Sequence, residues 1–402
     1  MRRMKRSGFL VFIGFLVFAL LLAACGSGSS SNGSSGQAGS SSTGTSSSNT
    51  SSTGTSSSGA SNAAETKPFY SSRDVIEIVV PFDAGGGTDA VARLFQKYLP
   101  NFIDGNPKVQ VVNIPGSGGV KGANDYAQRK PDGYSLLQSS TSLIMQYVLG
   151  AEALKLDYKT QLPLIATPGP GVTVVSNKVY SGDPKELLNI PKDALIYGSQ
   201  TPGGASAKTV LMLEFLKLAD KTKFVWGYEG TSNAWLAFQQ GEITVHSTPA
   251  NVYLNTIVDE GIAVPLAQIG YLDENGIMHR HPELSDVPTI IEVYREMYGE
   301  EPSGPLFDAV NAMAYVDELS KSLYMPKDAP AEAIAAIKNA MEKMVQDKEF
   351  RSEAYKVLES ENMIIGESLD KRNESFNKIS EDSLNYIRKL LAEKYGVKGL
   401  KY

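Results

Sequence analysis

Cysteine and histidine are scarce in this chain of 402 residues, which holds one cysteine, Cys25, and three histidines. A single cysteine makes neither an intrachain disulfide nor a zinc cluster. Three histidines leave few ligands for a transition metal and few general bases for a nucleophilic enzyme. The composition therefore predicts no metal site and no cofactor.

A basic excess is also missing, because 38 lysines and arginines stand against 44 acidic residues and give a formal net charge of −6. Nucleic-acid binding domains normally carry clustered positive charge, so no nucleic-acid partner is predicted. The 42% hydrophobic and 20% charged residues are typical of a soluble globular protein, and the length permits two or three domains.

The first 25 residues have the layout of a secretory signal, with four basic residues, an apolar run from Phe9 to Leu22 and a small-residue ending at Cys25. The apolar run is short for a membrane span. An uncleaved N-terminal anchor is the alternative interpretation, and both place the rest of the chain outside the cytoplasm. Removal of this segment would leave 34 basic against 44 acidic residues, about −10.

Residues 26–64 are almost entirely Ser, Gly, Thr, Ala and Asn, with no charged residue and no aliphatic side chain larger than alanine. Such a segment has nothing to bury, so we expect a disordered, flexible tether.

From residue 65 onward, short β-rich runs alternate with helical patterns. Strands are expected at Val75–Val80, Val109–Val112 and Tyr134–Gln138, with helices at Thr88–Leu99 and Gly119–Arg129 between them. This alternation predicts an α/β fold with a mostly parallel sheet, whose ligand sites lie beyond the carboxyl ends of the strands.

A second α/β unit is expected to begin at Gly171. Its predicted strands are Val172–Val175, Ala194–Tyr197, Phe224–Trp226 and Ile243–Val245, and its predicted helices are Lys208–Leu218, Trp235–Gln240 and Val252–Val258. The C-terminal part has helical patterns at Ala331–Val345 and Lys371–Leu391.

Three successive glycines, Gly85 to Gly87, join the first strand to the first helix. Glycine lets the backbone approach a ligand closely, and a helix start offers free N–H groups with partial positive charge. We expect an anion site there, with Thr88 or Asp89 as the N-cap.

Other interpretations of these glycines are a tight turn without a ligand and a dinucleotide-binding turn. The dinucleotide motif also needs an acidic residue for the ribose, whereas the second strand ends at Asn113. A phosphate loop is excluded because no Gly-Lys-Ser/Thr follows the glycines.

Several motifs, in order from about residue 70 to 350, resemble the substrate-binding proteins of tripartite tricarboxylate transporters, the TctC or Bug family. They are Val79-Val80-Pro81-Phe82, Gly85-Gly86-Gly87-Thr88-Asp89, Pro115-Gly116-Ser117-Gly118-Gly119, Pro131-Asp132-Gly133-Tyr134, Tyr197-Gly198-Ser199, Tyr228-Glu229-Gly230-Thr231, Asp286-Val287-Pro288-Thr289 and Pro326 with Pro330-Ala331-Glu332.

This resemblance implies a two-lobed clamshell of the type II periplasmic-binding-protein kind, with residues 65–170 and 264–402 in lobe 1 and residues 171–263 in lobe 2. It implies a monomer that binds a small carboxylate between its lobes, as di- and tricarboxylates or related organic acids, and delivers it to membrane permease subunits without catalysis. In such proteins the first glycine loop holds a carboxylate of the ligand.

The ligand-binding residues expected from the motifs and the resemblance are Ala84, Gly85, Gly86, Gly87, Thr88, Asp89, Thr141, Ser142, Gly203, Gly204, Ala205, Ser206, Tyr228 and His246. Thr141 and Ser142 have helix capping as an alternative role, and Tyr228 and His246 have packing in the core.

Two departures from the family pattern concern the second lobe. The usual Gly-Ser-x-x-His is replaced, so that a serine hydroxyl is lost at Gly204, with Ser206 as its candidate replacement. Ser247-Thr248 stands where many members have Phe-Asp, which weakens the case for an amino-acid ligand. His279-Arg280-His281 lies in a polar loop and makes a poor metal cage.

The segment Leu22-Ala23-Ala24-Cys25 resembles the bacterial lipoprotein box, which implies acylation of Cys25 and anchoring to the bacterial cell membrane from the outside. Two other functions stay open: a receptor that presents a bound carboxylate to a membrane sensor kinase, and a surface hydrolase. The sequence offers no set of nucleophile, base and oxyanion donors, so it predicts no enzyme.

Overall fold

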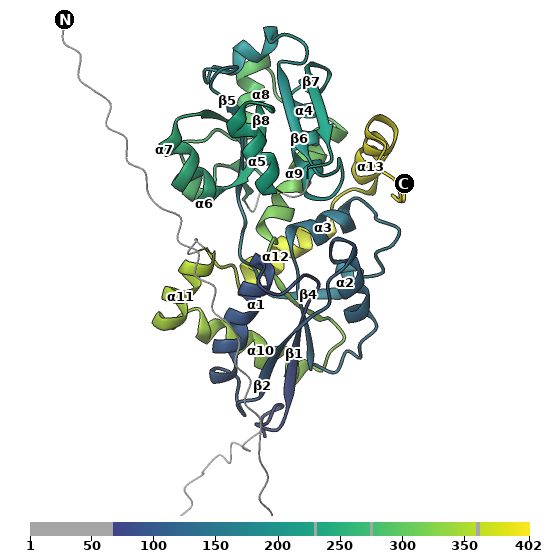
Figure 1. Ribbon diagram of the computed structural model, residues 1–402. Coiled ribbons are helices and arrows are strands. Elements are labelled where there is room, and N and C mark those ends of the chain that lie inside the picture. The colour runs from purple at the N-terminus through teal and green to yellow at the C-terminus, as the bar shows by residue number, and fades with distance from the viewer. Residues whose placement is uncertain (1–66, 229–230, 274–275, 359–361) are drawn as a thin grey trace, which may run out of the picture. The chain divides into compact units, whose positions relative to one another are not determined.

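The computed structural model describes residues 67–228, 231–273, 276–358 and 362–402. Two five-stranded sheets, each flanked by helices, form the two lobes of the compact unit that follows residue 64 (Figure 1). The signal, the tether and Cys25 lie outside the described residues, so the expectations for them stay predictions.

The first sheet has the strand order β2-β1-β3-β12-β4. Its strands are β1 (Val75–Val80), β2 (Lys108–Asn113), β3 (Ser135–Gln138), β4 (Gln161–Ile165) and β12 (Leu323–Pro326). Its helices are α1 (Gly87–Tyr98), α2 (Val120–Ala127), α3 (Thr141–Val148), α10 (Ala331–Met344), α11 (Lys348–Leu358) and α12 (Gly366–Asn377). The βαβαβ order expected from residues 75–138 is confirmed.

The second sheet has the strand order β7-β6-β8-β5-β9. Its strands are β5 (Gly171–Ser176), β6 (Leu195–Ser199), β7 (Thr222–Trp226), β8 (Val245–Pro249) and β9 (Ala263–Gln268), with a small hairpin of β10 (Tyr271–Leu272) and β11 (Met278–His279) after it. The helices in this part are α4 (Ala207–Phe215), α5 (Thr231–Gln240), α6 (Ala250–Val252), α7 (Val258–Glu260), α8 (Ile290–Tyr298), α9 (Pro305–Glu318) and α13 (Glu381–Tyr395).

One strand in each sheet runs against the other four. β12 is antiparallel to β3 and β4, and β5 is antiparallel to β8 and β9. Both are the strands by which the chain enters a sheet from the other lobe. The chain leaves the last strand of one sheet at that sheet's carboxyl edge and enters the other sheet at its carboxyl edge. The entering strand therefore runs antiparallel to the other strands of its sheet. The topology therefore brings the two carboxyl edges together, where α/β sheets place their ligands.

The second sheet extends beyond residue 263, where the sequence placed the boundary of lobe 2. β9 pairs with β5 through Ala263 to Gln268, and α8 packs against β9. The boundary was placed too early because a strand pattern does not show which sheet the strand joins. The partner of β9 is β5, about ninety residues earlier in the chain.

The helical pattern expected over Lys371–Leu391 is divided between two helices, because α12 ends at Asn377 and α13 begins at Glu381. The break lets α12 pack on β4 while α13 packs on α9. α9 itself buries Ala309, Met313 and Val316 in an apolar core that also takes in residues of α3 and α4. This shared core joins the lobes.

Candidate functional site

A cavity of about 290 Å³ lies between the carboxyl edges of the two sheets. It takes residues from β5, β6, β8 and α4 and from the two chain segments that cross between the lobes. Its polar lining consists of Thr141, Tyr197, Ser199, Ser206, Lys208, Thr209, His246, Ser247, Thr248, Ser320 and Lys321. The lining is rich in hydroxyl groups, which donate hydrogen bonds to an anion without adding charge.

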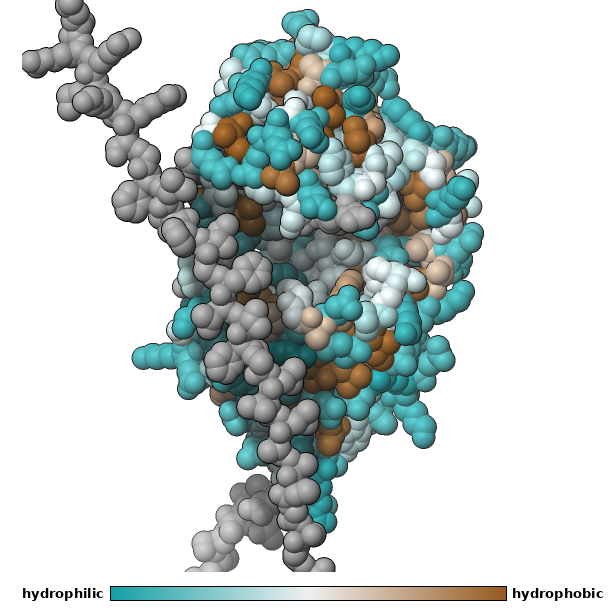
Figure 2. Space-filling model, in the orientation of Figure 1, coloured by the Kyte–Doolittle hydropathy of each residue, from teal (hydrophilic) through white to brown (hydrophobic). Residues whose placement is uncertain are grey.

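A second cavity of about 460 Å³ adjoins the first and shares Ser199, Ala205 and Ser206 with it. Lobe 1 contributes Gly118, Ser142 and Gln146, and the C-terminal residues 397–400 complete the wall. On the face shown in Figure 2, pale residues of intermediate hydropathy gather in the hollow between the lobes, while the surface above and below is mostly hydrophilic with scattered hydrophobic residues. The two cavities together form the candidate site.

The loop from β6 to α4 supplies the second-lobe side of the site. Ser199 ends β6, and its hydroxyl lies 2.6 Å from that of Ser206, directly before α4. Gly204 has φ +60, where a Cβ would be strained although it would contact nothing. A 3-10 turn, Gly204–Ser206, leads directly into α4, and the Ala207 N–H donates back to the Gly204 and Ala205 carbonyls of this turn. Thus the predicted residues 203–206 come together at a helix start beside both cavities.

Thr141 and Ser142 supply the first-lobe side. The cap of α3 is Ser140, whose hydroxyl accepts a hydrogen bond from the Leu143 N–H at 3.3 Å, so the capping role considered for Thr141 and Ser142 is wrong. The Thr141 hydroxyl lies 2.5 Å from that of Ser320, at the entry to β12. Thr141 lines the smaller cavity and Ser142 the larger one.

The glycine loop starts α1 with a different cap from the one expected. Gly86 is the N-cap and has no side-chain cap, because Asp89 stands inside the first turn. The Asp89 carboxylate instead accepts the Gly85 N–H at 2.8 Å and the Asn113 amide at 2.9 Å. Asp89 therefore fixes the glycine loop to the end of β2 from its buried side.

The pKa of the buried Asp89 carboxyl reflects these contacts. Burial alone would raise it, but the hydrogen bonds from Arg93, the Gly85 N–H and Asn113 outweigh burial and hold the pKa below its usual range. The charge on Asp89 is thus compensated inside lobe 1. By contrast, residues 84–87 are exposed, and a Cβ on Gly87 would meet no atom within 4 Å.

The six predicted residues 84–89 do not line either cavity. Their role as ligand contacts stays a prediction, since the loop follows β1 at the same carboxyl edge that bears Thr141.

His246 lines the smaller cavity from β8 and is only 6% exposed. Burial lowers the pKa of its imidazole to about 4, so the ring is neutral at physiological pH. Its ring centroid lies 5.4 Å from that of Trp235 and 5.9 Å from that of Phe238. The histidine therefore offers one neutral donor or acceptor backed by aromatic rings.

Tyr228 is placed differently, because it does not line either cavity. Its ring lies so close to Gly198 that a Cβ there would come within 2.6 Å of Cε2. The core alternative for Tyr228 is the one that matches this packing.

Lys208 is a site residue that the sequence did not reveal. It lines the smaller cavity from the first turn of α4 and forms an ion pair with Asp317 near the end of α9. Burial raises the pKa of the Asp317 carboxyl, and Lys208 opposes that rise. A signal was present, since Lys208 and Thr209 directly precede the apolar stretch Val210 to Leu213.

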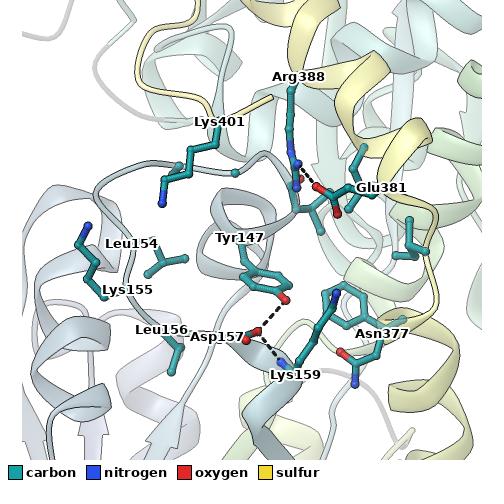
Figure 3. Close-up of a pocket in the computed structure, with 16 residues that line it drawn as sticks. Tyr147, Leu154, Lys155, Leu156, Asp157, Lys159, Asn377, Glu381, Arg388 and Lys401 are labelled. Atoms are coloured by element: carbon teal, nitrogen blue, oxygen red, sulfur yellow. Dashed lines mark hydrogen bonds and ion pairs between the residues drawn. The ribbon is translucent and has the colours of Figure 1, made fainter.

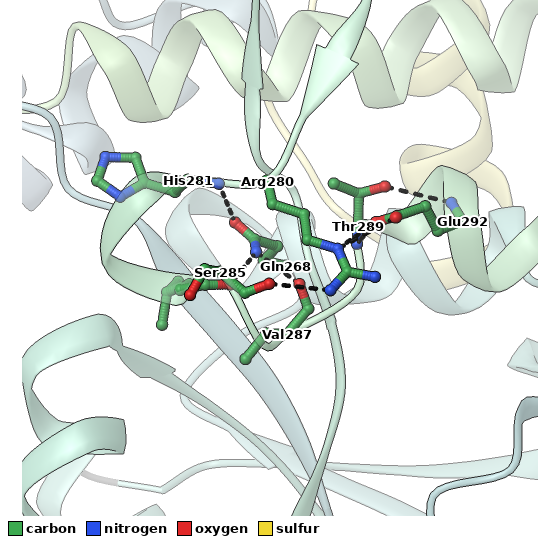
Figure 4. Close-up of polar contacts among 8 residues, drawn as sticks. Gln268, Arg280, His281, Ser285, Val287, Thr289 and Glu292 are labelled. Carbon is green, nitrogen blue, oxygen red and sulfur yellow. Dashed lines mark hydrogen bonds and ion pairs between the residues drawn. The ribbon is translucent and has the colours of Figure 1, made fainter.

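The His279-Arg280-His281 segment is part of a polar network around Gln268, at the end of β9 (Figure 4). The buried Gln268 amide donates to the carbonyls of Leu284 and Val287 at 2.8 and 2.7 Å and accepts the His281 N–H at 2.8 Å.

In the same network Arg280 pairs with Glu292, the residue that also forms a capping box with Thr289. The Asp286-Val287-Pro288-Thr289 motif therefore has a structural role here. Over the described ranges, no group of three or more His, Cys, Asp or Glu residues is arranged to hold a metal ion.

A further cavity of about 360 Å³ lies outside the cleft, between α3 and the α12–α13 segment (Figure 3). Within it, Tyr147 donates to Asp157 at 2.9 Å, and Arg388 pairs with Glu381 and donates to the Val148 carbonyl. Its charged groups are of both signs and partly paired, so it gives no evidence for a ligand of defined charge.

Comparison with known proteins comes first from the sequence. No family model matches the chain. A UPF0065 protein from the tcbD-tcbE intergenic region of Pseudomonas sp. strain P51 is 26% identical over 218 residues, which is 53% of this chain and 61% of the relative. Protein BugT of Bordetella pertussis is 45% identical over 67 residues, 17% of this chain and 20% of the relative. The chain thus aligns with less than two thirds of the length of these relatives.

Comparison of structures covers more of the chain. A TctC solute-binding protein from Polaromonas has a TM-score of 0.57 at 22% identity, over 82% of this chain and all of that one. A Rhodopseudomonas palustris protein with adipate has a TM-score of 0.53 at 18% identity, over 82% of this chain and 98% of that one. The fold is therefore that of a two-lobed periplasmic binding protein.

The sequence relatives specify the family more closely. They are UPF0065 and Bug proteins, and the structural neighbours are TctC and Bug solute-binding proteins. The chain is similar to proteins of this family, which is the one its motifs resemble. In the part of the chain that the structure describes, no helix is long and apolar enough to cross a membrane.

Proposed function

We propose that this protein is an extracytoplasmic solute-binding protein that captures a small carboxylate between its lobes and delivers it to a tripartite tricarboxylate-type permease. The main support is the pair of adjoining cavities at the carboxyl edges of both sheets. Neighbours of the same fold were solved with malate and with adipate, which favours an organic acid as the ligand.

The chemistry of the cavity lining suits an anion. None of the described residues that line the two cavities is an Asp or a Glu, so the lining places no like charge beside a carboxylate. Hydroxyls of Ser199, Ser206 and Thr141 can donate to its oxygens. Closure of the lobes would remove water and strengthen these hydrogen bonds.

The same lining argues against a hydrolase. His246 is the histidine among the lining residues, and its ring lies against Trp235 and Phe238 without an acidic residue in the lining to orient it. A serine nucleophile would need such a partner. A turnover assay on esters and amides tests this point, and any turnover that depends on His246 would overturn the binding-only role.

The ligand class is tested by a thermal-shift screen with organic acids, followed by calorimetric titration. A ligand present at 100 times its dissociation constant stabilises the folded state by about 2.7 kcal/mol. If no carboxylate binds to the folded chain, the proposed function is wrong.

The glycine loop is tested with Gly86→Val and Gly87→Val. A Cβ at Gly86 would lie 3.6 Å from the Asp83 carbonyl and one at Gly87 would meet nothing, so both variants should fold. We expect them to lose ligand binding, because the new side chains obstruct the anion turn. Ala331→Val, at the matching first position of α10, is the control. Normal affinity in folded Gly86→Val and Gly87→Val would remove the loop from the site.

Membrane attachment is a separate part of the proposal and rests on Cys25. Labelled fatty acid should be incorporated into the unmutated chain and not into Cys25→Ala, which should be released from the membrane. Incorporation that persists in Cys25→Ala would disprove the lipid anchor. Co-purification with permease subunits, and not with a sensor kinase, would support delivery.

A further inference from the structure

The end of α13 is fixed to lobe 2. Lys394 lies 2.9 Å from carboxylate oxygens of both Glu214, on α4, and Asp220. Tyr395 donates a hydrogen bond to Glu214, and its ring centroid lies 5.1 Å from that of Phe224 on β7. These contacts therefore hold this end of the helix to a strand and a helix of the second lobe.

Beyond α13 the chain returns to lobe 1 as a C-terminal tail, residues 397–402. The Glu152 N–H donates to the Gly399 carbonyl at 2.8 Å, and the Lys401 N–H donates to the Gly150 carbonyl, also at 2.8 Å. Both are backbone hydrogen bonds, so they depend on the path of the tail and not on its side chains. The tail thus ties the segment that follows α3 to a helix end that is fixed to lobe 2.

The tail and α13 enclose this segment of lobe 1 closely. Arg388 Nε, on α13, donates to the Val148 carbonyl at 3.0 Å. A Cβ on Gly150 would lie 2.8 Å from the Lys401 carbonyl oxygen and 2.9 Å from Arg388 Nε. There is no room here for even one methyl group, so the contact between the tail and lobe 1 is tight.

The lobes are separated on the opposite side of the cleft. In Figure 1, α13 and the C-terminus lie on the right, and α6, α7 and α11 lie on the left. On that left side a gap of about 720 Å³ takes residues of both lobes, among them Leu254, between α6 and α7, and Tyr355 of α11. These two side chains are 44% and 54% exposed. The lobes are therefore tied beside α13 and stand apart beside α11.

This asymmetry determines on which side the lobes can move apart. Opening on the α13 side would break the two backbone hydrogen bonds of the tail, whose residues 397–400 line the larger cavity. Opening on the α11 side breaks neither of them. A cleft with a restricted range of opening also loses less conformational freedom when it closes on a ligand.

We infer that the C-terminal tail is a strap between the lobes, which prevents them from opening on the α13 side and leaves the α11 side as the mouth of the cleft. This strap goes beyond the proposed function, because it constrains the ligand-free protein and does not depend on which ligand binds. It is therefore tested without a ligand.

The experiment measures distances between spin labels on the two lobes by pulsed electron paramagnetic resonance. Exposed positions on the α13 side are Ala153→Cys in lobe 1 and Lys223→Cys on β7, and those on the α11 side are Leu254→Cys and Tyr355→Cys. Each pair is introduced into the purified full chain with Cys25→Ala, which removes the one native thiol. With an intact tail, we expect a narrower distance distribution for the α13-side pair than for the α11-side pair.

Two changes release the strap. Deletion of residues 397–402 removes it, and Gly150→Ala places a methyl group against the Lys401 carbonyl. In both variants we expect the α13-side distances to broaden and to lengthen by roughly 5 Å, a displacement of the size by which packed elements move past one another. Gly299→Ala is the matched control, because Gly299 has φ +69, close to the +66 of Gly150, but its Cβ would meet no atom within 4 Å. It should leave both distributions unchanged.

Circular dichroism and denaturant unfolding establish whether each variant is folded. An unchanged α13-side distribution in the folded deletion variant overturns the strap, and if that variant does not fold, the same result in Gly150→Ala overturns it. Equal broadening in Gly299→Ala and Gly150→Ala also overturns it, because backbone strain would then be the cause. Since no ligand is present, failure of the strap leaves the proposed function standing, and a chain that binds no carboxylate leaves this test unaffected.

Discussion

Lys208, in the first turn of α4, forms a buried ion pair with Asp317, near the end of α9. The Lys208 side chain is 17% exposed and the Asp317 side chain 6%, so water compensates little of either charge. The backbone carbonyl of Asp317 also accepts the Gly169 N–H at 3.0 Å, where the chain first crosses between lobes. The pair therefore ties the wall of the cleft to the crossing segment.

Removal of one partner of this pair should be strongly destabilising. Lys208→Met leaves the Asp317 carboxylate buried without its cation, and we expect the free energy of unfolding to fall by about 3–5 kcal/mol. Denaturant unfolding measures this. In the double variant Lys208→Met/Asp317→Leu most of the loss should be regained, and a double variant as unstable as the single one would show that packing, not charge, is responsible.

Asp89 should be important for the glycine loop. In Asp89→Ala the Gly85 N–H loses its acceptor and the Asn113 amide keeps only the Phe82 carbonyl, so the free energy of unfolding should fall by about 1–3 kcal/mol. Ligand affinity should fall too, because the loop is no longer fixed. The control is Asp83→Ala, an exposed residue of the same loop, which should change the free energy of unfolding by less than about 0.5 kcal/mol. Equal effects of the two substitutions would contradict the role of Asp89.

His246 predicts a stability loss in acid. Its pKa is about 4 in the folded state, below the value of 6.5 for a free imidazole, so the unfolded chain binds the proton more tightly. The stability that this group contributes is complete above pH 6.5 and is lost as the pH falls from about 6.5 to about 4. Between pH 7.5 and pH 4.5 the unmutated chain should lose roughly 2–3 kcal/mol more than His246→Asn. The control His279→Asn, at an exposed histidine, should lose as much unfolding free energy between these pH values as the unmutated chain. If the stability of His246→Asn depended on pH in the same way as that of the unmutated chain, this account would be contradicted.

Gln268 should be hard to replace. Gln268→Leu keeps a similar volume but leaves the His281 N–H and the Val287 carbonyl without their partner, while the Leu284 carbonyl keeps the Val287 N–H. Each buried group left unsatisfied costs about 1–3 kcal/mol. We expect a total loss of more than about 3 kcal/mol in denaturant unfolding. Gln239→Leu, on the exposed face of α5, serves as the control. A loss below about 1 kcal/mol in Gln268→Leu would mean that water replaces the amide.

Local patterns in the sequence were sufficient for the elements that position lobe 1. The β-rich run of β1, the glycines after it and the apolar spacing of α1 are each specified within a few residues, because strand and helix periodicities are local properties. The sequence also predicted Ser142 and Ser206 as site residues, and both line the larger cavity because they follow strands at a carboxyl edge.

The ends of elements and the boundary of lobe 2 were less predictable. Asp89 resembles a helix cap in sequence, and only the position of Asn113 shows that the carboxylate turns toward the core. β9 belongs to lobe 2 because it pairs with β5, and strand pairing depends on residues that lie far away in the chain.

The sequence by itself determined the family resemblance, the α/β class and the glycine turn, since these depend on short ordered motifs. Only the tertiary structure decided that Lys208 meets Asp317 and that the C-terminal tail passes beside Gly150 and brings Lys398 to the cavity. The physical reason is that contacts between residues more than a hundred positions apart follow from how the helices pack on the two sheets, and no local pattern records that packing.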